Sequence, residues 1–381
     1  MRVTRVLLRD FRNCERGELA LGPGLTVVSG PNGAGKTNLL EGLYFGLTGR
    51  SCRTANEREV VRQGATTTRV AVETEAEDGA HLLEAGFSPG EPKRLRVDGA
   101  RVERLGVGAP RPPVSVFLPD RLELVKGAPG ARRAHIDQFV GALWPARVET
   151  RAAYTRALAQ RNALVARVRA GSARTELLDA WDAELASHGA RLMADRAAAA
   201  DLLDEPFAGR AAELGLPEPA RLRYRPRSRA RDESELRAEL LARREDDLAR
   251  GFSGHGPHRD ELGLDHGGRT LRAYGSQGQQ RVALLALLFA ERDVLVARGA
   301  PPLMLLDDVT SELDAERRER VTALVRAAGQ TVLTTTEPEH VPGAHDADVV
   351  LVRVREGELT RADGIADDHD APPRATNAVP A

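Results

Sequence analysis

The order of apolar and polar positions predicts a β-rich beginning to the chain. Short apolar runs separated by Gly, Pro or Asp-Gly turns are typical of strands and hairpins. Seven such runs lie at positions 3–8, 17–21, 25–29, 69–73, 82–87, 95–97 and 114–118. The segment 38–47 instead has apolar residues at helical spacing, so we expect one helix directly after a glycine-rich loop.

From about residue 134 the pattern becomes helical. Segments 145–170 and 175–200 are long, rich in Ala, Leu, Arg and Glu, and separated by a Gly-Ser pair. They predict an antiparallel helical hairpin, and a third helix is expected at 232–250.

A run of arginines interrupts this helical region. Arginine occupies every odd position from 221 to 231. A strand here would place these arginines on one face and Leu222 and Tyr224 on the other, although Pro226 interrupts the pattern.

An alternation of helices and strands returns after residue 251. The predicted elements are a helix at 277–298, a strand at 303–306, a helix at 314–328, a strand at 331–335 and a strand at 349–354 that closes the sheet. The chain is thus expected to be an α/β domain split in two by a mostly helical insert. The predicted parts are residues 1–133, 134–251 and 252–361, followed by a tail at 362–381 with too few apolar residues to fold.

Composition narrows the class of protein. The 381 residues include 55 Lys and Arg against 56 Asp and Glu, so any binding of nucleic acid must rely on a local patch. Only three of the 55 are lysines, which makes arginine clusters weak evidence for phosphate binding. Two cysteines exclude a multi-bridge secreted scaffold, and the longest apolar run, 282–290, is too short to cross a membrane. We expect a cytoplasmic protein with no membrane partner.

The glycine-rich segment carries the first candidate chemistry, because it matches the phosphate-binding P-loop G-x-x-x-x-G-K-[ST]. Its residues are Gly30, Pro31, Asn32, Gly33, Ala34, Gly35, Lys36 and Thr37. Such a loop turns backbone N–H groups toward phosphate oxygens at a helix N-terminus. Lys36 can then reach the β- and γ-phosphates, and the Thr37 hydroxyl can ligate Mg²⁺.

Two carboxylates at the end of strand 303–306 supply the second candidate. Asp307 would share in holding Mg²⁺, and Asp308 would orient or deprotonate the attacking water. Lys36 and Asp307 lie 271 positions apart, a gap that would contain a whole compact P-loop kinase or GTPase domain. Two half-domains must therefore fold together across the insert.

A second helix N-terminus suited to an anion is predicted at Ser276. Ser276 is a natural N-cap for the helix 277–298, and Gly278 would let a backbone approach closely. Because Lys36 already serves the phosphates of its own subunit, the simplest use of this terminus is to contact the γ-phosphate bound by another subunit. Residues 311–314 would lie near the same contact between the two subunits.

Taken together, these motifs resemble the ABC-type ATPase heads of the SMC kind, and in finer detail the RecF family of bacterial DNA replication and repair proteins. The resembling stretches are 10–13, 30–41, 49–51 with 53–54, 117–120, 127 and 129 leading to 132–133, 256–260, 274–281 and 305–314. The resemblance implies a split α/β ABC-type P-loop ATPase head with a mixed β-sheet and a mostly helical inserted arm. It also implies ATP and Mg²⁺ as ligands, an ATP-dependent homodimer, DNA binding, and help in loading the RecA recombinase with RecO and RecR.

The resemblance also assigns roles to single residues. Arg12 and Asn13 would lie beside the nucleotide, and Ser276, Gly278 and Gln279 would contact ATP across the dimer. ABC heads usually carry Glu where this chain has Asp308; the shorter carboxylate predicts slow hydrolysis, with bound ATP acting as a dimer clamp.

Contacts with DNA are less specific in the sequence. Candidates for sequence-independent phosphate contact are Arg50, Arg53, Arg132, Arg133 and the run 221–231. Because arginine is so common here, a solvated surface is the favoured interpretation of each, and phosphate contact is the alternative.

Another SMC-like chromosome protein or another ABC-type ATPase head remains the alternative. A structural chromosome protein of the SMC class would need sustained heptads over several hundred residues, whereas the insert has about 118 and breaks at Gly171. A transporter motor would couple to membrane subunits and should lack so large an insert.

Overall fold

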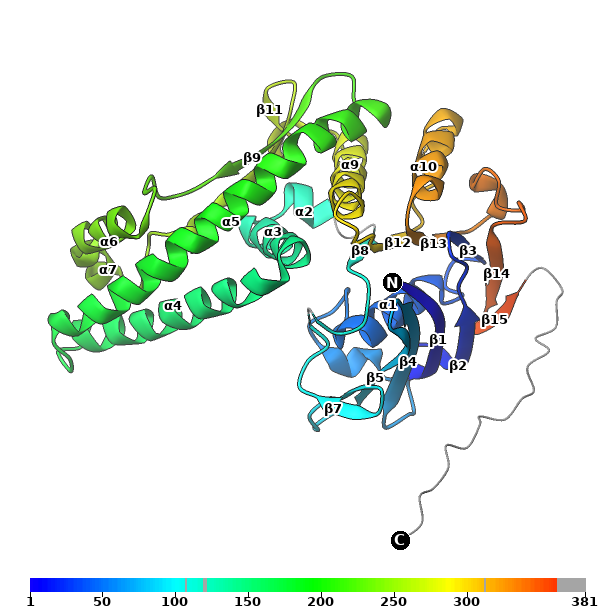
Figure 1. Ribbon diagram of the computed structural model, residues 1–381, viewed down its shortest axis with the longest axis horizontal. Helices are drawn as coiled ribbons and strands as arrows, with labels where there is room; N and C mark the ends of the chain where they lie inside the picture. Colours follow the sequence, from blue (N-terminus) through cyan, green and yellow to red (C-terminus); the bar gives the residue numbers. More distant parts are fainter. Residues whose placement is uncertain (107, 119–121, 312, 362–381) are drawn as a thin grey trace, which may run out of the picture.

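The computed structural model describes residues 1–106, 108–118, 122–311 and 313–361. The tail expected to be disordered lies outside the described residues, as do positions 119–120 and 312 of the resembling stretches. Figure 1 shows a head built on two sheets and a long helical arm that projects from it.

The first sheet is antiparallel and belongs wholly to the N-terminal part. Its order is β2-β1-β4-β5-β6-β7. The strands are β1 (Arg2–Phe11), β2 (Cys14–Ala20), β4 (Thr68–Ala76), β5 (Gly79–Phe87), β6 (Arg94–Val97) and β7 (Ala100–Val102). Helix α1 (Lys36–Thr48) packs on it so closely that a Cβ at Gly46 would lie 2.5 Å from the Val72 side chain. We call this sheet with α1 the N-terminal lobe.

The second sheet joins the two halves of the head. Its order is β15-β14-β3-β13-β12-β8, and all pairs are parallel except β14 with β15. The strands are β3 (Leu25–Ser29), β8 (Val114–Phe117), β12 (Leu303–Asp307), β13 (Gln330–Thr335), β14 (Val350–Arg355) and β15 (Glu358–Arg361). The P-loop strand β3 lies between two strands from the far end of the chain, so the predicted split α/β head with a mixed sheet is confirmed. The prediction that 349–354 closes the sheet is wrong, because β14 is internal and the antiparallel β15 forms that edge.

Helices form the arm and flank the second sheet. They are α2 (Glu123–Lys126), α3 (Pro129–Leu143), α4 (Val148–Arg169), α5 (Leu178–Glu213), α6 (Glu233–Ala242), α7 (Arg244–Arg250), α8 (Leu271–Tyr274), α9 (Gln277–Val296) and α10 (Ala315–Ala327). Short 3₁₀ turns occur at Glu57–Val60, Pro145–Arg147, Thr175–Leu177, Pro257–Arg259 and Pro338–His340. The expected hairpin is α4 against α5 (Figure 1). The expected third helix, 232–250, is two helices that meet at Arg243.

Helix α5 is longer than predicted, and packing explains the difference. It continues past residue 200, through Pro206, to Glu213. Leu203, Phe207 and Ala211 repeat at helical spacing, are fully buried, and belong to the core shared with α9. This apolar stripe outweighs the helix-breaking tendency of the proline.

A small third sheet lies where the arm meets the head. Its order is β11-β10-β9, formed by β9 (Ala220–Arg225), β10 (Glu261–His266) and β11 (Arg269–Thr270). This sheet spans the predicted boundary at 251/252, and α3 spans the one at 133/134. The division into parts therefore remains a prediction about folding units. Within the described residues, no helix combines the length and apolar character needed to cross a membrane.

Candidate functional site

The P-loop connects β3 to α1 and has no room for side chains at two of its glycines. A Cβ at Gly30 would lie 2.3 Å from the Val354 carbonyl oxygen. Gly35 has a φ of 113°, and a Cβ there would meet the Asn13 amide at 2.8 Å. These positions need glycine because the loop passes too close to Val354 and Asn13 to leave room for a side chain.

The ammonium of Lys36 is hydrogen-bonded to the backbone of the P-loop. Its Nζ donates to the carbonyl oxygens of Gly30 at 2.7 Å and Pro31 at 3.0 Å. Burial lowers the pKa of Lys36, whereas the nearby carboxylates of Asp308 and Asp307 raise it. A bound phosphate could replace these two carbonyls as the hydrogen-bond acceptor of the Lys36 ammonium.

Thr37 and Asp307 bring the two halves of the head into direct contact. The Thr37 hydroxyl is 2.8 Å from one Asp307 carboxylate oxygen, and Asp307 also accepts a hydrogen bond from Thr334 Oγ1 at 2.7 Å. Burial raises the pKa of Asp307, and the two hydroxyls oppose this rise. A hydroxyl beside one buried carboxylate could supply the protein ligands of a magnesium site, which phosphate oxygens and water would have to complete.

The backbone of Asp308 has a strained conformation that leaves its carboxylate facing the pocket. Its φ is 48°, in the left-handed region that Asp tolerates better than most residues. Its N–H donates to the hydroxyl and the carbonyl of Thr334. Within the described part of the chain its buried Oδ1 has no hydrogen-bond partner, which leaves a carboxylate oxygen for a water or ligand.

These groups line one pocket of about 280 Å³. Its walls are Asn32, Gly33, Gly35, Lys36, Thr37, Asn38, Arg53, Asp307 and Asp308. The pocket contains both carboxylates and five of the eight predicted P-loop residues; Gly30, Pro31 and Ala34 do not line it. It also contains Asn38, which was not a candidate, and Arg53, which was predicted to contact DNA.

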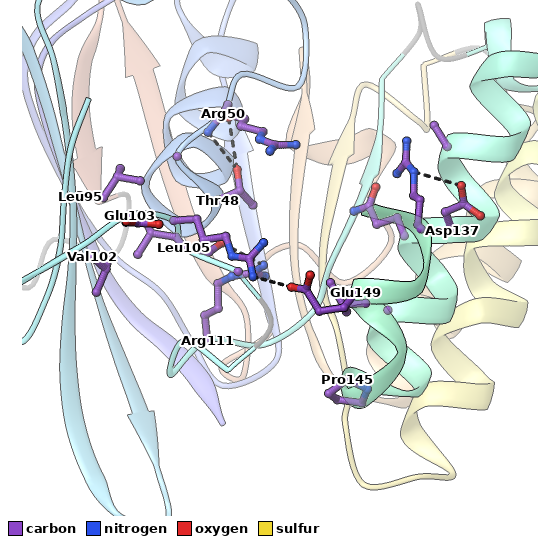
Figure 2. Close-up of a pocket in the computed structure, with 18 of the residues that line it drawn as sticks. Thr48, Arg50, Leu95, Val102, Glu103, Leu105, Arg111, Asp137, Pro145 and Glu149 are labelled. Atoms are coloured by element: carbon purple, nitrogen blue, oxygen red, sulfur yellow. Dashed lines mark hydrogen bonds and ion pairs between the residues drawn. The ribbon is translucent and has the colours of Figure 1, made fainter. Parts of the chain in front are cut away.

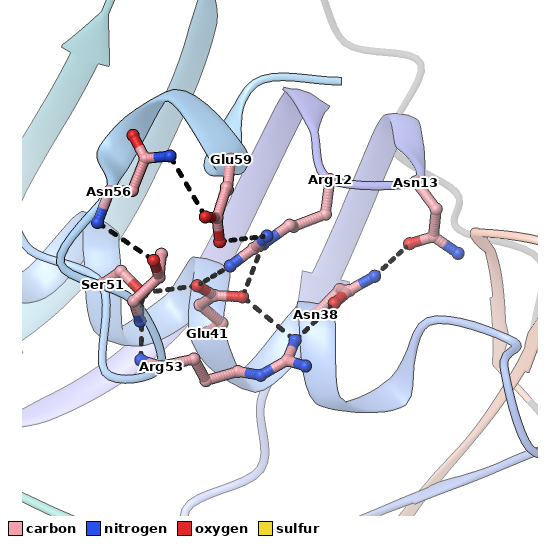
Figure 3. A network of polar contacts seen from close by, with 9 residues as sticks. Arg12, Asn13, Asn38, Glu41, Ser51, Arg53, Asn56 and Glu59 are labelled. Atoms are coloured by element: carbon pink, nitrogen blue, oxygen red, sulfur yellow. Dashed lines mark hydrogen bonds and ion pairs between the residues drawn. The ribbon is translucent and has the colours of Figure 1, made fainter. Parts of the chain in front are cut away.

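A buried carboxylate, Glu41, organises the rim of this pocket (Figure 3). Glu41 is fully buried on α1 and accepts two hydrogen bonds from Arg12, at 2.7 and 2.9 Å. Ser51 donates to it at 2.5 Å, and Arg53 lies 3.3 Å away. The guanidinium of Arg53 also donates to Asn38 at 2.9 Å. One carboxylate thus fixes two arginines beside the P-loop.

Asn13 joins the same network from the turn between β1 and β2. Its Oδ1 accepts from Asn38 at 2.8 Å, and its Nδ2 donates to the Ala34 carbonyl at 3.3 Å. Arg12 and Asn13 therefore lie next to the P-loop but are not among the residues that line the pocket. Sequence reasoning missed Glu41, although its position on the predicted helix one turn after Thr37 was a usable signal.

Replacing Glu41 with glutamine should destabilise the protein strongly, because two guanidinium groups would lose their buried counter-charge. Removing one partner of a fully buried ion pair costs about 3–5 kcal/mol, which is an upper bound here because the side chains of Arg12 and Arg53 are 18% and 35% exposed. Thermal unfolding measures the loss. Glu59, which lies 3.8 Å from Arg12 and is about half exposed, is the matched control: Glu59→Gln should cost less than about 1 kcal/mol. Equal losses for the two variants would contradict the organising role of Glu41.

The predicted N-cap at Ser276 is confirmed, and it forms a complete capping box. Ser276 Oγ accepts from the Gln279 N–H at 3.2 Å, and the Gln279 side chain accepts from the Ser276 N–H at 2.9 Å. Gly278 is exposed, and a Cβ there would meet only its neighbour Ser276, at 4.0 Å. No packing among the described residues therefore requires glycine at this position.

We call the N-terminus of α9, with Ser276, Gly278 and Gln279, the signature; helix α9 is hydrogen-bonded to the loop that carries Asp308 in its own chain. Arg281, one turn into the helix, donates to the Asp308 carbonyl at 2.7 Å. None of Ser276, Gly278 and Gln279 is among the residues that line the pocket described above. The signature and the pocket are thus separate surfaces of one chain.

The four arginines predicted to contact DNA have different surroundings. Arg50 lies on the wall of a cleft of about 1190 Å³ between the N-terminal lobe and α3 and α4, which the Arg104–Glu149 ion pair spans (Figure 2). Arg53 lines the P-loop pocket.

Arg132 corrects the prediction. It is 3% exposed, it forms two hydrogen bonds with Glu261, and it donates to three backbone carbonyls. Such a side chain holds α2, α3 and β10 together and has no free face for a phosphate. Arg133 donates to the Asp260 carbonyl at 2.8 Å in the same joint.

The chain is similar in sequence to curated proteins that share one name. A family model described as an AAA domain matches residues 5–98. The DNA replication and repair protein RecF of Streptomyces avermitilis is 36% identical over 364 residues, which cover 90% of this chain and 95% of the relative. The RecF of an Anaeromyxobacter species is 38% identical over 376 residues, covering 94% and 99%.

Solved structures agree with this result. A recombination mediator protein RecF–ATPrS structure from the RecFOR pathway matches with a TM-score of 0.82 at 25% identity, covering 94% of this chain and 98% of that one. An Smc head bound to the C-terminal winged-helix domain of ScpA matches with a TM-score of 0.58 at 17% identity, covering 95% and 97%. The second likeness concerns the fold alone.

Proposed function

The chain belongs to the RecF family of DNA replication and repair proteins, and from this premise we propose that it is an ATP-switched clamp on DNA. In this proposal one ATP with Mg²⁺ binds in the P-loop pocket of each subunit and is completed by the signature of the other. The observation that carries the proposal is the contact between Thr37 and Asp307, which assembles P-loop and acidic strand end from opposite ends of the chain.

The pocket groups have chemistry suited to each part of the ligand. Lys36 and the loop N–H groups would bind the phosphates, and Thr37 and Asp307 would hold Mg²⁺. Arg53, fixed by Glu41 and Asn38, would add positive charge at the rim. A relative described as RecF–ATPrS supports a nucleotide of this kind.

The signature supports binding between subunits rather than within one. Ser276, Gly278 and Gln279 do not line the pocket of their own chain, and among the described residues the space over Gly278 contains only Ser276 Oγ, at 4.0 Å from a Cβ. Glycine has a lower helix propensity than Ala, and no packing among the described residues requires it here. A second copy would supply the reason for glycine at this position if its nucleotide approached this backbone.

Hydrolysis is proposed to be slow. Asp308 would position the attacking water with its unpartnered Oδ1, but a carboxylate one methylene shorter than Glu reaches less far. ATP would therefore hold the dimer closed for long periods.

The proposed biological role is repair at DNA gaps or junctions, in which this protein helps RecO and RecR to load RecA. DNA binding would be independent of base sequence, because the candidate contacts are arginines suited to phosphates. We propose a cytoplasmic, nucleoid-associated location on the same grounds. The alternative, a structural chromosome protein, is favoured only by the shared head fold.

Sedimentation with and without ATP and Mg²⁺ tests the clamp. The wild-type protein should become a dimer with ATP, and Lys36→Arg should stay a monomer, because a bulkier cation cannot fit between the loop carbonyls and the phosphate. Adding duplex DNA should show tighter binding only where the dimer forms. A wild-type protein that remains monomeric with saturating non-hydrolysable nucleotide would overturn the proposal.

A further inference from the structure

We infer that the arginines at odd positions from 221 to 231 form a binding stripe for the phosphate backbone of duplex DNA along the base of the arm. The six residues, which we call the arginine stripe, are Arg221, Arg223, Arg225, Arg227, Arg229 and Arg231. All six are exposed. The inference rests on the proposed DNA-binding function and gives it a location on the chain.

The fold turns this sequence pattern into one face. In β9, Ala220 and Leu222 are 1–2% exposed and pack in the core that also contains α5, whereas the odd positions point the other way. After the strand ends, the exposed Pro226 interrupts the alternation, and it resumes at Ser228, which is 1% exposed and donates to Glu239 at 2.6 Å between the exposed Arg227 and Arg229. Figure 1 shows this segment running from β9 along the arm toward α6.

The spacing suits a regular polyanion. Alternate residues of a strand are about 6.6 Å apart, and ten residue steps reach at most about 36 Å when fully extended. One turn of duplex DNA is about 34–36 Å long, so the stripe can follow the backbone over up to one turn. The backbone is anchored where the strand ends, since the N–H of Arg227 donates to the buried Asp260 at 2.7 Å.

Much of the charge on the stripe is not neutralised. Arg221 pairs with Asp204 and Arg225 with Asp265. The described ion pairs include none for the other four side chains. Across the sheet, Arg223 faces Gly263, which contributes no carboxylate. From 219 to 231 the sequence contains no Asp or Glu at all.

The abundance of arginine in this chain does not account for the pattern. A compositional bias supplies arginines but does not place one at every second position, exposed, with small or apolar residues between them. The protein has a net charge of −1, so a polyanion must be attracted locally. Single-stranded DNA is disfavoured as the ligand, because the odd positions of the described segment 221–231 are all arginines and offer no aromatic ring on which bases could stack. The rigid duplex backbone is the ligand that fits.

The test compares two triple variants by salt titration of a fluorescent 30-base-pair duplex. The stripe variant is Arg223→Gln, Arg229→Gln and Arg231→Gln. The control carries the same charge change on exposed arginines of the N-terminal lobe: Arg9→Gln, Arg16→Gln and Arg96→Gln. Each lost phosphate contact lowers the slope of log K against log salt by about 0.9. The stripe variant should lose up to about 2.7 from the slope, and the control should keep it.

Each outcome has a distinct meaning. Equal slopes for the two variants, or a wild-type protein with no salt-dependent duplex binding, would overturn the stripe. If the stripe variant kept its affinity for duplex but lost binding to poly-L-glutamate, the surface would be a docking site for acidic protein, and the DNA assignment would be wrong. Sedimentation with ATP is recorded for both variants. Loss of ATP-induced pairing in the wild type would count against the clamp, while the duplex titration would still report on the stripe.

Discussion

Replacing Asp308 with asparagine should lower the rate of ATP hydrolysis by a factor on the order of 10²–10⁴ and leave the ATP-induced dimer intact. Asparagine has nearly the same shape and also tolerates a φ of 48°, so the loop should keep its conformation. What is lost is the charge on the carboxylate whose Oδ1 is free to orient or deprotonate water. Release of phosphate measures turnover, and sedimentation measures pairing.

Asp307→Asn provides the contrast, because it changes the neighbouring carboxylate in the same way. Asp307 is hydrogen-bonded to Thr37 and would be a magnesium ligand, so this variant should lose nucleotide affinity and pairing together. If Asp308→Asn also abolished pairing, or hydrolysed ATP as fast as the wild type, the role given to Asp308 would be wrong.

Replacing Gly278 with leucine should abolish ATP-induced pairing without destabilising the protein. Among the described residues the Cβ of the new side chain would meet only Ser276 Oγ, at 4.0 Å, and leucine favours a helix over glycine by several tenths of a kcal/mol. In the dimer, however, the side chain would fill the space that the other subunit's nucleotide must enter. We expect the dimer to weaken at least tenfold, which is about 1.4 kcal/mol.

Gly209 on α5 offers a matched control, because it is also an exposed helical glycine with nothing near its Cβ. Gly209→Leu should leave pairing unchanged, and both variants should unfold at or above the wild-type temperature. Normal pairing by Gly278→Leu would show that the signature is not at the interface.

The chemistry of the head could be predicted from the sequence because each of its parts is local. Gly30 to Thr37 match the phosphate-binding loop pattern through neighbouring residues alone, and Ser276 could be read as an N-cap from its place before the helix. Even the separation of Lys36 from Asp307 indicated a split domain, and the pairing of β3 with β13 confirms it.

What could not be predicted depends on contacts between distant segments. Nothing near Arg132 in the sequence indicates Glu261, 129 positions away, so a buried structural arginine looked like a phosphate contact. Arg53 enters the pocket only because Glu41 and Asn38 hold it there. Helix α5 continues past Pro206 because its apolar stripe meets α9. In each case a contact with a segment distant in sequence, and not the local propensity, decided where the residue or helix lies.

The place of β3 in the second sheet has a consequence for biosynthesis. Its two neighbours, β13 and β14, leave the ribosome some 300 residues after it, and in the register Thr331 pairs with Leu25. Pairing between segments so far apart in sequence is slow to form, so the apolar P-loop strand must wait unpaired while the arm is synthesised. The nascent N-terminal half should therefore depend on chaperones, and a chain cut before residue 330 should aggregate rather than fold.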